Sequence, residues 1–327
     1  SCMLSHILKH SGIDCNAFLG GISKNYNTNI LIGDSNLMII EADEYDRSFL
    51  SLNPFIGLVS SVDKDHIDTY STYEDMLFAY NKFIKKCQNI IIHEGVRNKL
   101  QGPKITNTIF YSFSNENALG YSLKNNHNIS HTNFSVMNNN ELLFSLEFPS
   151  IPKYNIENFL AAISIALELN VKYDNIIDSI RSFKGVNRRF EYHVKNDNFT
   201  LIEDYAHHPV ELKNLIENVR LLHPEKKITL IFQPHLFSRT KDFLNEFSSI
   251  LSNVHRLILL DIYAAREKPM NDFSIYDLFS RINLSNKIIL CKKDICTYLL
   301  DFDCDLIVVA GAGDVSNIIP DLKKHFS

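Results

Sequence analysis

The spacing of apolar positions divides the chain into two parts with different rhythms. Up to about residue 190, helical segments are mixed with short apolar runs that predict strands at Asn29 to Ile32, Leu37 to Glu41, Ile56 to Ser61 and Asn89 to His93. Alternating polar and apolar positions between residues 105 and 150 predict a run of antiparallel strands. After Pro152, apolar residues recur at helical spacing, which predicts a helix with one buried face.

From about residue 193 the pattern becomes a regular alternation of strands and helices. Strands are predicted at Thr200 to Glu203, Ile228 to Phe232, Arg256 to Leu260, Lys287 to Leu290 and Leu306 to Ala310, and helices at Pro209 to Leu222 and Thr240 to Leu251. This alternation is typical of a doubly wound parallel sheet in an α/β protein. A polar, arginine-bearing stretch from Lys184 to Tyr192 is the candidate hinge, so we predict two domains, 1–190 and 191–327.

Composition narrows the class of protein. A chain of 327 residues suggests about two domains, and 45% hydrophobic residues are ordinary for a globular protein. The formal net charge of −5 provides no basic surface for nucleic acid or an anionic membrane. No apolar run reaches the length of a membrane span, and the 6 cysteines form no CxxC pair. We therefore expect a cytoplasmic protein with reduced thiols.

Unusual polar residues follow four strands of the second part. These junctions are Asp204 to Pro209, Gln233 to Arg239, Asp261 to Glu267 and Gly311 to Asp314. In open α/β sheets ligands bind beyond the carboxyl ends of the strands, so acid, histidine and arginine should meet at one edge. Helix capping by His208, and caps or turns at Ser238 and Asp204, are the alternative explanations.

Carboxylates follow two strands of the first part. Glu41 to Asp46 comes after one strand, and Asp63 to Asp68 comes after the next. Such loops could hold a divalent cation through oxygen ligands, although acid-rich loops are more often simply solvated. A histidine such as His66 would be an atypical ligand for Mg²⁺, which prefers oxygen.

Seven segments of the chain, taken in order, resemble the Mur ligases, the enzymes that build the peptide stem of peptidoglycan. They are Glu41 to Asp46, Asp65 to Asp68, Asn155 to Asn158, Asn187 to Glu191, Asp204 to Pro209, Phe232 to Thr240 and Gly311 to Gly313. The resemblance covers essentially the whole chain. It implies a central ATP-binding domain of the P-loop type, followed by a Rossmann-like doubly wound C-terminal domain.

The resemblance also implies parts that this sequence does not contain. The family has a first domain that binds the UDP-sugar, and its central domain opens with a Gly-Lys-Thr loop that cradles the ATP phosphates. The chain begins at Ser1, directly in an apolar helical pattern, so we expect a piece cut from a larger protein. We expect this piece alone to bind ATP weakly and to lack ligase activity.

Residue roles implied by the resemblance concern the nucleotide and its metal first. Glu41 and His66 match the family's Mg²⁺ ligands. Asn155 matches a residue that contacts the adenine, with helix capping after Pro152 as the rival explanation. Arg188 matches an arginine at the nucleotide site, and Asp204 matches an acid near the ATP ribose.

The remaining implied roles concern the reaction itself. His207, His235 and Arg239 match residues that face the reacting carboxylate, phosphate and amino acid. The implied activity is ATP-dependent, ADP-forming joining of L-alanine to UDP-N-acetylmuramate through an acyl phosphate. A ligase that recycles whole peptides onto UDP-muramic acid is the alternative, and a degenerate, non-catalytic remnant is a third hypothesis. The sequence leaves the oligomeric state open.

Overall fold

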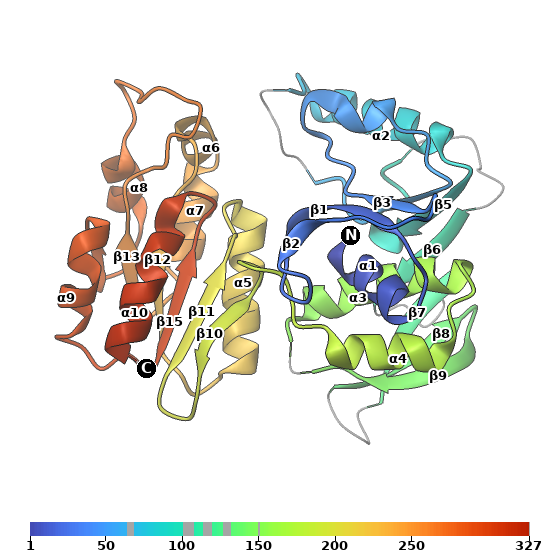
Figure 1. The fold of residues 1–327 in the computed structure, drawn as a ribbon. Coiled ribbons are helices and arrows are strands. Elements are labelled where there is room, and N and C mark those ends of the chain that lie inside the picture. Colours follow the sequence, from blue (N-terminus) through green and yellow to red (C-terminus); the bar gives the residue numbers. More distant parts are fainter. Residues whose placement is uncertain (64–68, 101–107, 114–119, 127–131, 150, 327) are drawn as a thin grey trace. The chain divides into compact units, whose positions relative to one another are not determined.

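The computed structural model of the chain describes residues 1–63, 69–100, 108–113, 120–126, 132–149 and 151–326. The chain divides into two compact units, Ser1–Gly185 and Val186–Ser327 (Figure 1). The division falls inside the polar stretch that the sequence marks as a hinge, while movement about that stretch stays a prediction. Within the described residues, no helix is long and apolar enough to cross a membrane.

The first unit contains two separate β-sheets and the helices that pack against them. Its elements are α1 (Cys2–His10), β1 (Asn16–Ser23), β2 (Thr28–Leu31), β3 (Met38–Ile40), η1 (Tyr45–Ser51), β4 (Ile56–Val59), α2 (Tyr73–Lys86), β5 (Asn89–His93), η2 (Glu94–Val96), β6 (Thr108–Ser112), β7 (Gly120–Asn125), β8 (Asn133–Asn138), β9 (Glu141–Glu147), α3 (Lys153–Glu168) and α4 (Tyr173–Ser182), where η marks a 3₁₀ helix. The strands predicted from the apolar runs are present: β5 has the predicted bounds, and the ends of the other three differ by no more than two residues.

The two sheets of the first unit differ in strand direction. The three-stranded sheet has the order β2-β1-β3, in which β1 is antiparallel to β2 and parallel to β3. The six-stranded sheet runs from β4 to β9 in chain order. Its strand β6 is parallel to both β5 and β7, whereas β8 and β9 continue antiparallel. The prediction of an all-antiparallel run between 105 and 150 is therefore wrong for β6, because periodicity reveals a strand but not its direction.

Helices cover both faces of the six-stranded sheet. On one face, Phe83 and Ile84 of α2 pack with Ile90 and Ile92 of β5. Helix α3 lies on the other face, where Nε2 of His93 in β5 lies 2.8 Å from a glutamate carboxylate oxygen of α3. Helix α1 packs against α3 and α4. This layering agrees with the α/β class that the sequence predicts.

The second unit is a six-stranded sheet with helices on both faces. Its elements are β10 (Glu191–Lys195), β11 (Thr200–Asp204), α5 (Pro209–Leu222), β12 (Ile228–Phe232), α6 (Phe237–Asp242), α7 (Leu244–Leu251), β13 (Arg256–Leu259), α8 (Ile275–Arg281), β14 (Lys287–Ile289), η3 (Lys292–Asp294), α9 (Ile295–Leu299), β15 (Leu306–Ala310), η4 (Asp314–Ile318) and α10 (Ile319–Phe326) (Figure 1). The strand order is β10-β11-β15-β12-β13-β14, and only β10 is antiparallel to its neighbour. The predicted doubly wound sheet is confirmed.

Strands β11, β12 and β15 are buried along their whole length, as expected for central strands covered on both faces. One predicted helix of this unit is interrupted. Instead of a single helix over Thr240 to Leu251, α6 ends at Asp242 and α7 begins at Leu244. Phe243 between them leaves helical geometry, with φ −106° and ψ 27°. Its ring packs edge-on against His208, with ring centroids 4.7 Å apart, and a contact of this kind between distant residues has no sequence signature.

Candidate active site

Four neighbouring strands of the second unit end at the same edge of its sheet. They are β11, β15, β12 and β13, in that spatial order. Their register pairs Asp204 with Ala310, Ala310 with Phe232, and Phe232 with Leu259. Of the four junctions that the sequence singles out, one begins at Asp204 itself and the others begin within two residues after their strand's paired residue. They therefore start side by side, at the edge where open α/β sheets bind ligands.

His207 lies between the end of β11 and the start of α5. Helix α5 begins with Pro209 at its first position and His208 as its N-cap, as the capping alternative predicts. The Glu211 carboxylate accepts the backbone N–H groups of His207 and His208 at 3.0 and 3.1 Å. These bonds fix the chain around His207. Capping is the role of His208, which leaves His207 as the histidine turned toward the neighbouring junction.

The ring nitrogens of His207 are distinguished by their partners. Nδ1 lies 3.0 Å from the carbonyl oxygen of Tyr205 and 3.3 Å from the Glu211 carboxylate. A carbonyl oxygen only accepts hydrogen bonds, so Nδ1 carries the proton and donates it. In the neutral ring the lone pair therefore belongs to Nε2. A histidine in this tautomer can act as a base through Nε2.

His235 and Arg239 belong to the junction after β12. Between them, Leu236 has φ +70° and ψ 135°. Positive φ in a leucine costs about 1 to 2 kcal/mol, so the surrounding structure must hold this turn. The Arg239 guanidinium lies 3.4 Å from Nδ1 of His235. Because a guanidinium only donates, Nδ1 accepts and the neutral ring of His235 carries its hydrogen on Nε2.

The three residues predicted to act in the reaction lie close together. The rings of His207 and His235 meet edge to face, with planes at 68° and centroids 5.6 Å apart. Burial and the neighbouring charges of His207 and Arg239 lower the pKa of His235 to about 4. At neutral pH His235 therefore presents a hydrogen on Nε2 beside the Arg239 guanidinium, and the neutral form of His207 presents a lone pair on Nε2. Together they can accept a proton, donate a hydrogen bond and bind an anion.

Asp204 has a bracing role in the structure. One carboxylate oxygen accepts the N–H of Phe190 at 2.7 Å, and the other accepts the N–H of Ala206 at 2.8 Å. Burial raises the pKa of Asp204 to about 6, although these two hydrogen bonds act in the opposite direction. The turn role named as an alternative is thus present, and the ribose contact stays a prediction.

The side chain of Arg188 is engaged within its own unit. Its Nη2 donates to the carbonyl oxygens of Gly311 and Gly313 at 2.5 and 3.1 Å, and its Nε lies 3.1 Å from the Glu203 carboxylate. The guanidinium carbon also lies 4.7 Å from the centre of the Tyr205 ring. Arg188 therefore ties the ends of β11 and β15 together. Its predicted contact with a nucleotide is not tested by these bonds.

The segment from Gly311 to Gly313 is a close-packed turn. Gly311 has φ +146°, and a Cβ there would lie 2.7 Å from the carbonyl oxygen of Gln233. A Cβ at Gly313 would lie 2.6 Å from the ring of Tyr263. These glycines are required by the close approach of their backbone to the β12 and β13 junctions. Close packing of this turn accounts for both glycines.

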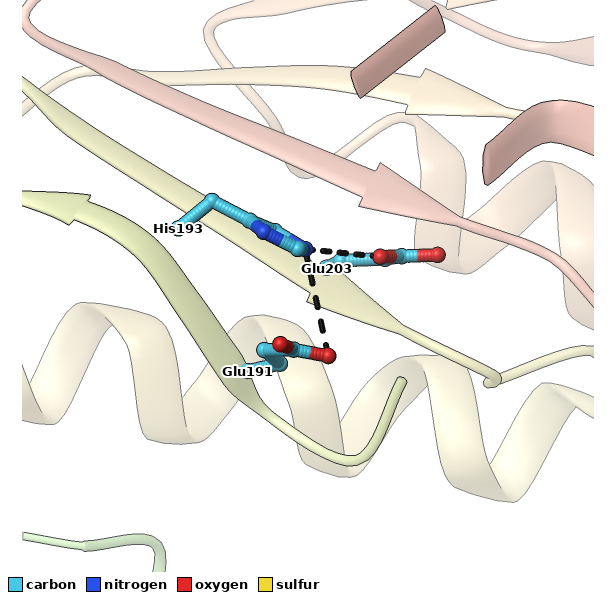
Figure 2. A group of neighbouring side chains, drawn as sticks. All are labelled: Glu191, His193 and Glu203. Atoms are coloured by element: carbon cyan, nitrogen blue, oxygen red, sulfur yellow. Dashed lines mark hydrogen bonds and ion pairs between the residues drawn. The ribbon is translucent and has the colours of Figure 1, made fainter. Parts of the chain in front are cut away.

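Glu191, His193 and Glu203 form a compact group on β10 and β11 (Figure 2). Nε2 of His193 lies 2.7 Å from Glu203 and 3.9 Å from Glu191. The carboxylates are already hydrogen-bonded, because Arg188 donates its backbone N–H to Glu191 at 2.9 Å and Ser316 donates to Glu203 at 2.5 Å. With a guanidinium also beside Glu203, this group is a charge network between strands.

Of the metal and adenine residues predicted in the first unit, the structure describes two. The exposed carboxylate of Glu41 follows β3, where Oε2 accepts the N–H of Gly20 at 3.0 Å and the hydroxyl of Ser1. Asn155 lies in the first turn of α3 and donates its backbone N–H to Pro152, which is the N-cap, so the capping explanation for Asn155 is wrong. His66 lies outside the described residues.

Sequence reasoning gave no role to residues of the junction after β13. Tyr263 stacks on the ring of His235, with centroids 5.7 Å apart and planes at 20°. The carboxylate of Glu267 contacts Ser238, between His235 and Arg239 in sequence at the start of α6. The only signal in the sequence was that this segment follows a strand in the same sheet. Which of its side chains face His235 is decided by the fold.

Comparison with known proteins shows the family to which this chain belongs. The family model of the Mur ligase middle domain matches residues 20–166, and that of the Mur ligase glutamate ligase domain matches residues 188–313. The chain therefore belongs to the Mur ligase family, whose members are ATP-dependent ligases that form ADP. The expected family assignment is confirmed.

Two curated relatives have the same name, UDP-N-acetylmuramate–L-alanine ligase. The protein of Cytophaga hutchinsonii is 39% identical over 337 residues, covering 99% of this chain and 70% of its own length. That of Flavobacterium johnsoniae is 37% identical, covering 99% of this chain and 71% of its own length. These relatives support peptidoglycan synthesis as the process that the chain serves.

Solved structures share the fold. The UDP-N-acetylmuramate–alanine ligase of Thermotoga maritima superposes with a TM-score of 0.78 at 19% identity, covering 99% of this chain and 72% of that chain. A murein peptide ligase from Psychrobacter arcticus has a TM-score of 0.67 at 16% identity, covering 99% of this chain and 74% of that chain. At these identities the superpositions support the fold alone, and the α/β class predicted from the sequence is confirmed.

Proposed function

We propose that the gene product containing this chain joins L-alanine to UDP-N-acetylmuramate at the expense of ATP. The observation that carries the proposal is the clustering of His207, His235 and Arg239 at one sheet edge, in a chain 39% identical to a ligase of that name. A cytoplasmic location, where a nucleotide-linked sugar and ATP are available, goes with this activity and stays a prediction.

The proposed reaction has two stages. The muramoyl carboxylate attacks the γ-phosphorus of ATP, so an acyl phosphate forms and ADP leaves. The amine of L-alanine then attacks the acyl carbon, the amide bond forms and phosphate leaves. Activation is needed because a free carboxylate is a poor acyl donor toward an amine. Phosphoryl transfer asks the protein chiefly for positioning and for neutralisation of charge.

In this proposal the three clustered residues serve the second stage. Nε2 of His207 accepts a proton from the alanine ammonium, since Nδ1 is held as a donor by the Tyr205 carbonyl. Arg239 binds a carboxylate or phosphate through two oxygens at once, as a planar guanidinium can. His235, neutral because its pKa is lowered, donates Nε2–H to an oxygen of the same substrate.

The remaining predicted residues are assigned to the first stage. Asn155, Arg188 and Asp204 are proposed to serve the nucleotide, by adenine, nucleotide-site and ribose contacts respectively. Glu41 and His66 are proposed to hold Mg²⁺. For Glu41, an exposed carboxylate beside the Ser1 hydroxyl is an oxygen donor set that suits a hard cation. When bound, Mg²⁺ would neutralise negative charge on the transferring phosphate.

ADP release by the whole gene product tests the proposal. We expect release that requires UDP-N-acetylmuramate and L-alanine together, and that disappears when either is omitted. Release with an alanine-containing tripeptide, but not with L-alanine, would assign the chain to peptide recycling instead. No release with either acceptor, from a folded protein that binds neither ATP nor substrate, would favour a non-catalytic remnant.

A further inference from the structure

The strained turn that carries His235 into α6 is held by a segment outside its own strand and helix. Leu236, at φ +70°, donates its N–H to the carbonyl oxygen of Tyr263 at 2.9 Å. In return, Tyr263 donates its N–H to the carbonyl oxygen of Pro234, also at 2.9 Å. This parallel bridge between His235 and Tyr263 continues the pairing of β12 with β13 past the strand ends.

The side chain of Tyr263 adds a second contact to the same turn. Its ring is stacked on the imidazole of His235, with centroids 5.7 Å apart and planes at 20°. The ring is seated against the backbone of Gly313, where an added Cβ would lie 2.6 Å from it. Because the backbone of Gly313 contacts one side of the Tyr263 ring, the ring has little freedom to tilt. The ring therefore limits the orientations open to His235.

Glu267 makes a third contact, at the start of α6. One oxygen of its carboxylate accepts the backbone N–H of Ser238 at 3.1 Å, and the other accepts the Ser238 hydroxyl. Glu267 is itself fixed by its backbone N–H, which bonds the Ala264 carbonyl oxygen at 2.8 Å. Because Arg239 follows Ser238 directly, this contact sets where the Arg239 side chain leaves the helix.

We propose that the β13 loop, residues 261–267, positions His235 and Arg239 for the reaction, with Tyr263 orienting the imidazole and Glu267 anchoring the start of α6. Both are positioning residues and act through the two groups they hold. All of these contacts lie within the second unit. Their consequence for catalysis rests on the proposed function.

The first test follows the imidazole of His235 in this chain by histidine-selective NMR during a pH titration. The ionisable groups that act on it are His207, Arg239, Arg266 and Glu267. In Tyr263→Ala the covering ring is gone, so we expect the pKa of His235 to rise from about 4 toward its ordinary value of 6.5. Tyr263→Phe keeps the ring and should keep the lowered pKa.

The matched control for this titration is Tyr276→Ala, because Tyr276 is 68% exposed in α8 of the same unit. It should leave the His235 signals unchanged. If Tyr263→Ala is folded, as judged by its amide spectrum, and His235 still titrates as in the unaltered chain, the role of Tyr263 is wrong. A loss of the lowered pKa in Tyr263→Phe as well would also contradict orientation by the ring.

The second test measures steady-state constants of the whole gene product. Glu267→Ala should raise KM for L-alanine about tenfold and leave KM for ATP within about twofold, because the displaced group is Arg239. Glu267→Gln retains an oxygen for the Ser238 N–H and an amide hydrogen for its hydroxyl, so it should recover most of the loss. A general loss of folded protein would instead lower the rate without separating the two KM values.

Equal changes in both KM values, or none, would overturn the role of Glu267. The two tests also separate this inference from the proposed function. Should the unaltered gene product show no alanine-dependent ADP release, the proposed function fails while the NMR titration still decides whether Tyr263 orients His235. Should ligation be present and the titration unaffected, the positioning role fails and the function stands.

Discussion

The two units of this protein place their candidate site residues in different ways. In the second unit, β11, β15, β12 and β13 are neighbours in one parallel sheet, so the residues after them meet at one edge. In the first unit, Glu41 follows β3 of the three-stranded sheet and Asp63 follows β4 of the six-stranded sheet. Strand pairing thus brings His207 and His235 together, whereas β3 and β4, the strands before the two acidic segments, are not paired in one sheet.

This difference shows how far strand order supports a site prediction. Parallel register in one sheet places the ends of neighbouring strands at the same level. If the sheet is predicted correctly, the residues that meet at its edge can therefore be predicted as well. Where two strands belong to separate sheets, their loops meet only if packing brings them together. Strand order accordingly supports the cluster in the second unit, whereas it gives no support to the predicted metal ligands of the first unit.

The largest expected effect comes from Arg239, which tests the second unit. Arg239→Ala should lower kcat/KM for L-alanine by about 10³, because one charged donor to a developing or fixed anion is lost. Arg239→Lys should restore only part, since an ammonium cannot bind two oxygens in one plane. The measurement is ADP release against L-alanine concentration. Arg281→Ala, on α8 and bonded to Asn245, is the control and should change little.

His207 should have the next largest effect. His207→Ala is expected to lower kcat by about 10², as loss of a general base does, with imidazole in the buffer restoring part of the rate. His255→Ala, at an exposed position of the same unit, should leave kcat within about twofold. If His207→Ala keeps its full rate, the general base is another group. His207 then no longer belongs to the candidate site of the second unit.

Glu41 tests the first unit and should have a smaller effect. Glu41→Ala is expected to raise the Mg²⁺ concentration for half-maximal rate about tenfold, since one oxygen ligand is removed. The exposed Glu141 on β9 provides the control Glu141→Ala. An unchanged magnesium dependence would remove Glu41 from the metal site and leave the first unit without a described ligand.

The smallest expected effect concerns stability rather than rate. Burial alone would raise the pKa of Glu203, but hydrogen bonds from His193 and Ser316, together with the Arg188 guanidinium, outweigh it and the pKa is lowered. A lowered folded-state pKa gives stability that is present above the unfolded value of about 4.5 and is lost as the pH falls through the folded value.

Glu203→Gln should therefore be less stable near pH 7, and its free energy of unfolding should fall less steeply below about pH 4.5. Urea unfolding at several pH values measures this. Glu225→Gln, at an exposed turn, is the matched control and should follow the unaltered chain. Parallel pH curves for Glu203→Gln and the unaltered chain would show that the network in Figure 2 does not stabilise the charged carboxylate.

Much of the fold can be read from local pattern. Helix α5 and strands β5, β12 and β15 have the predicted bounds, because apolar spacing, Pro209 and the strand lengths are local signals. The direction of β6 and the break at Phe243 were not predictable, since both depend on contacts with residues far away in sequence. Helix boundaries that depend on residues close in sequence were predictable, whereas tertiary contacts were not.

The same division holds for the site. Sequence alone determined the family, the two-part α/β architecture and the set of polar residues that follow the strands of the second unit. Only the tertiary structure decided that Asp204 and Arg188 brace the backbone, that His207 and His235 face each other, and that Tyr263 and Glu267 hold the turn. The physical reason is that a residue's type and spacing determine which bonds it can form, whereas its partner is set by the register and packing of strands far apart in the chain.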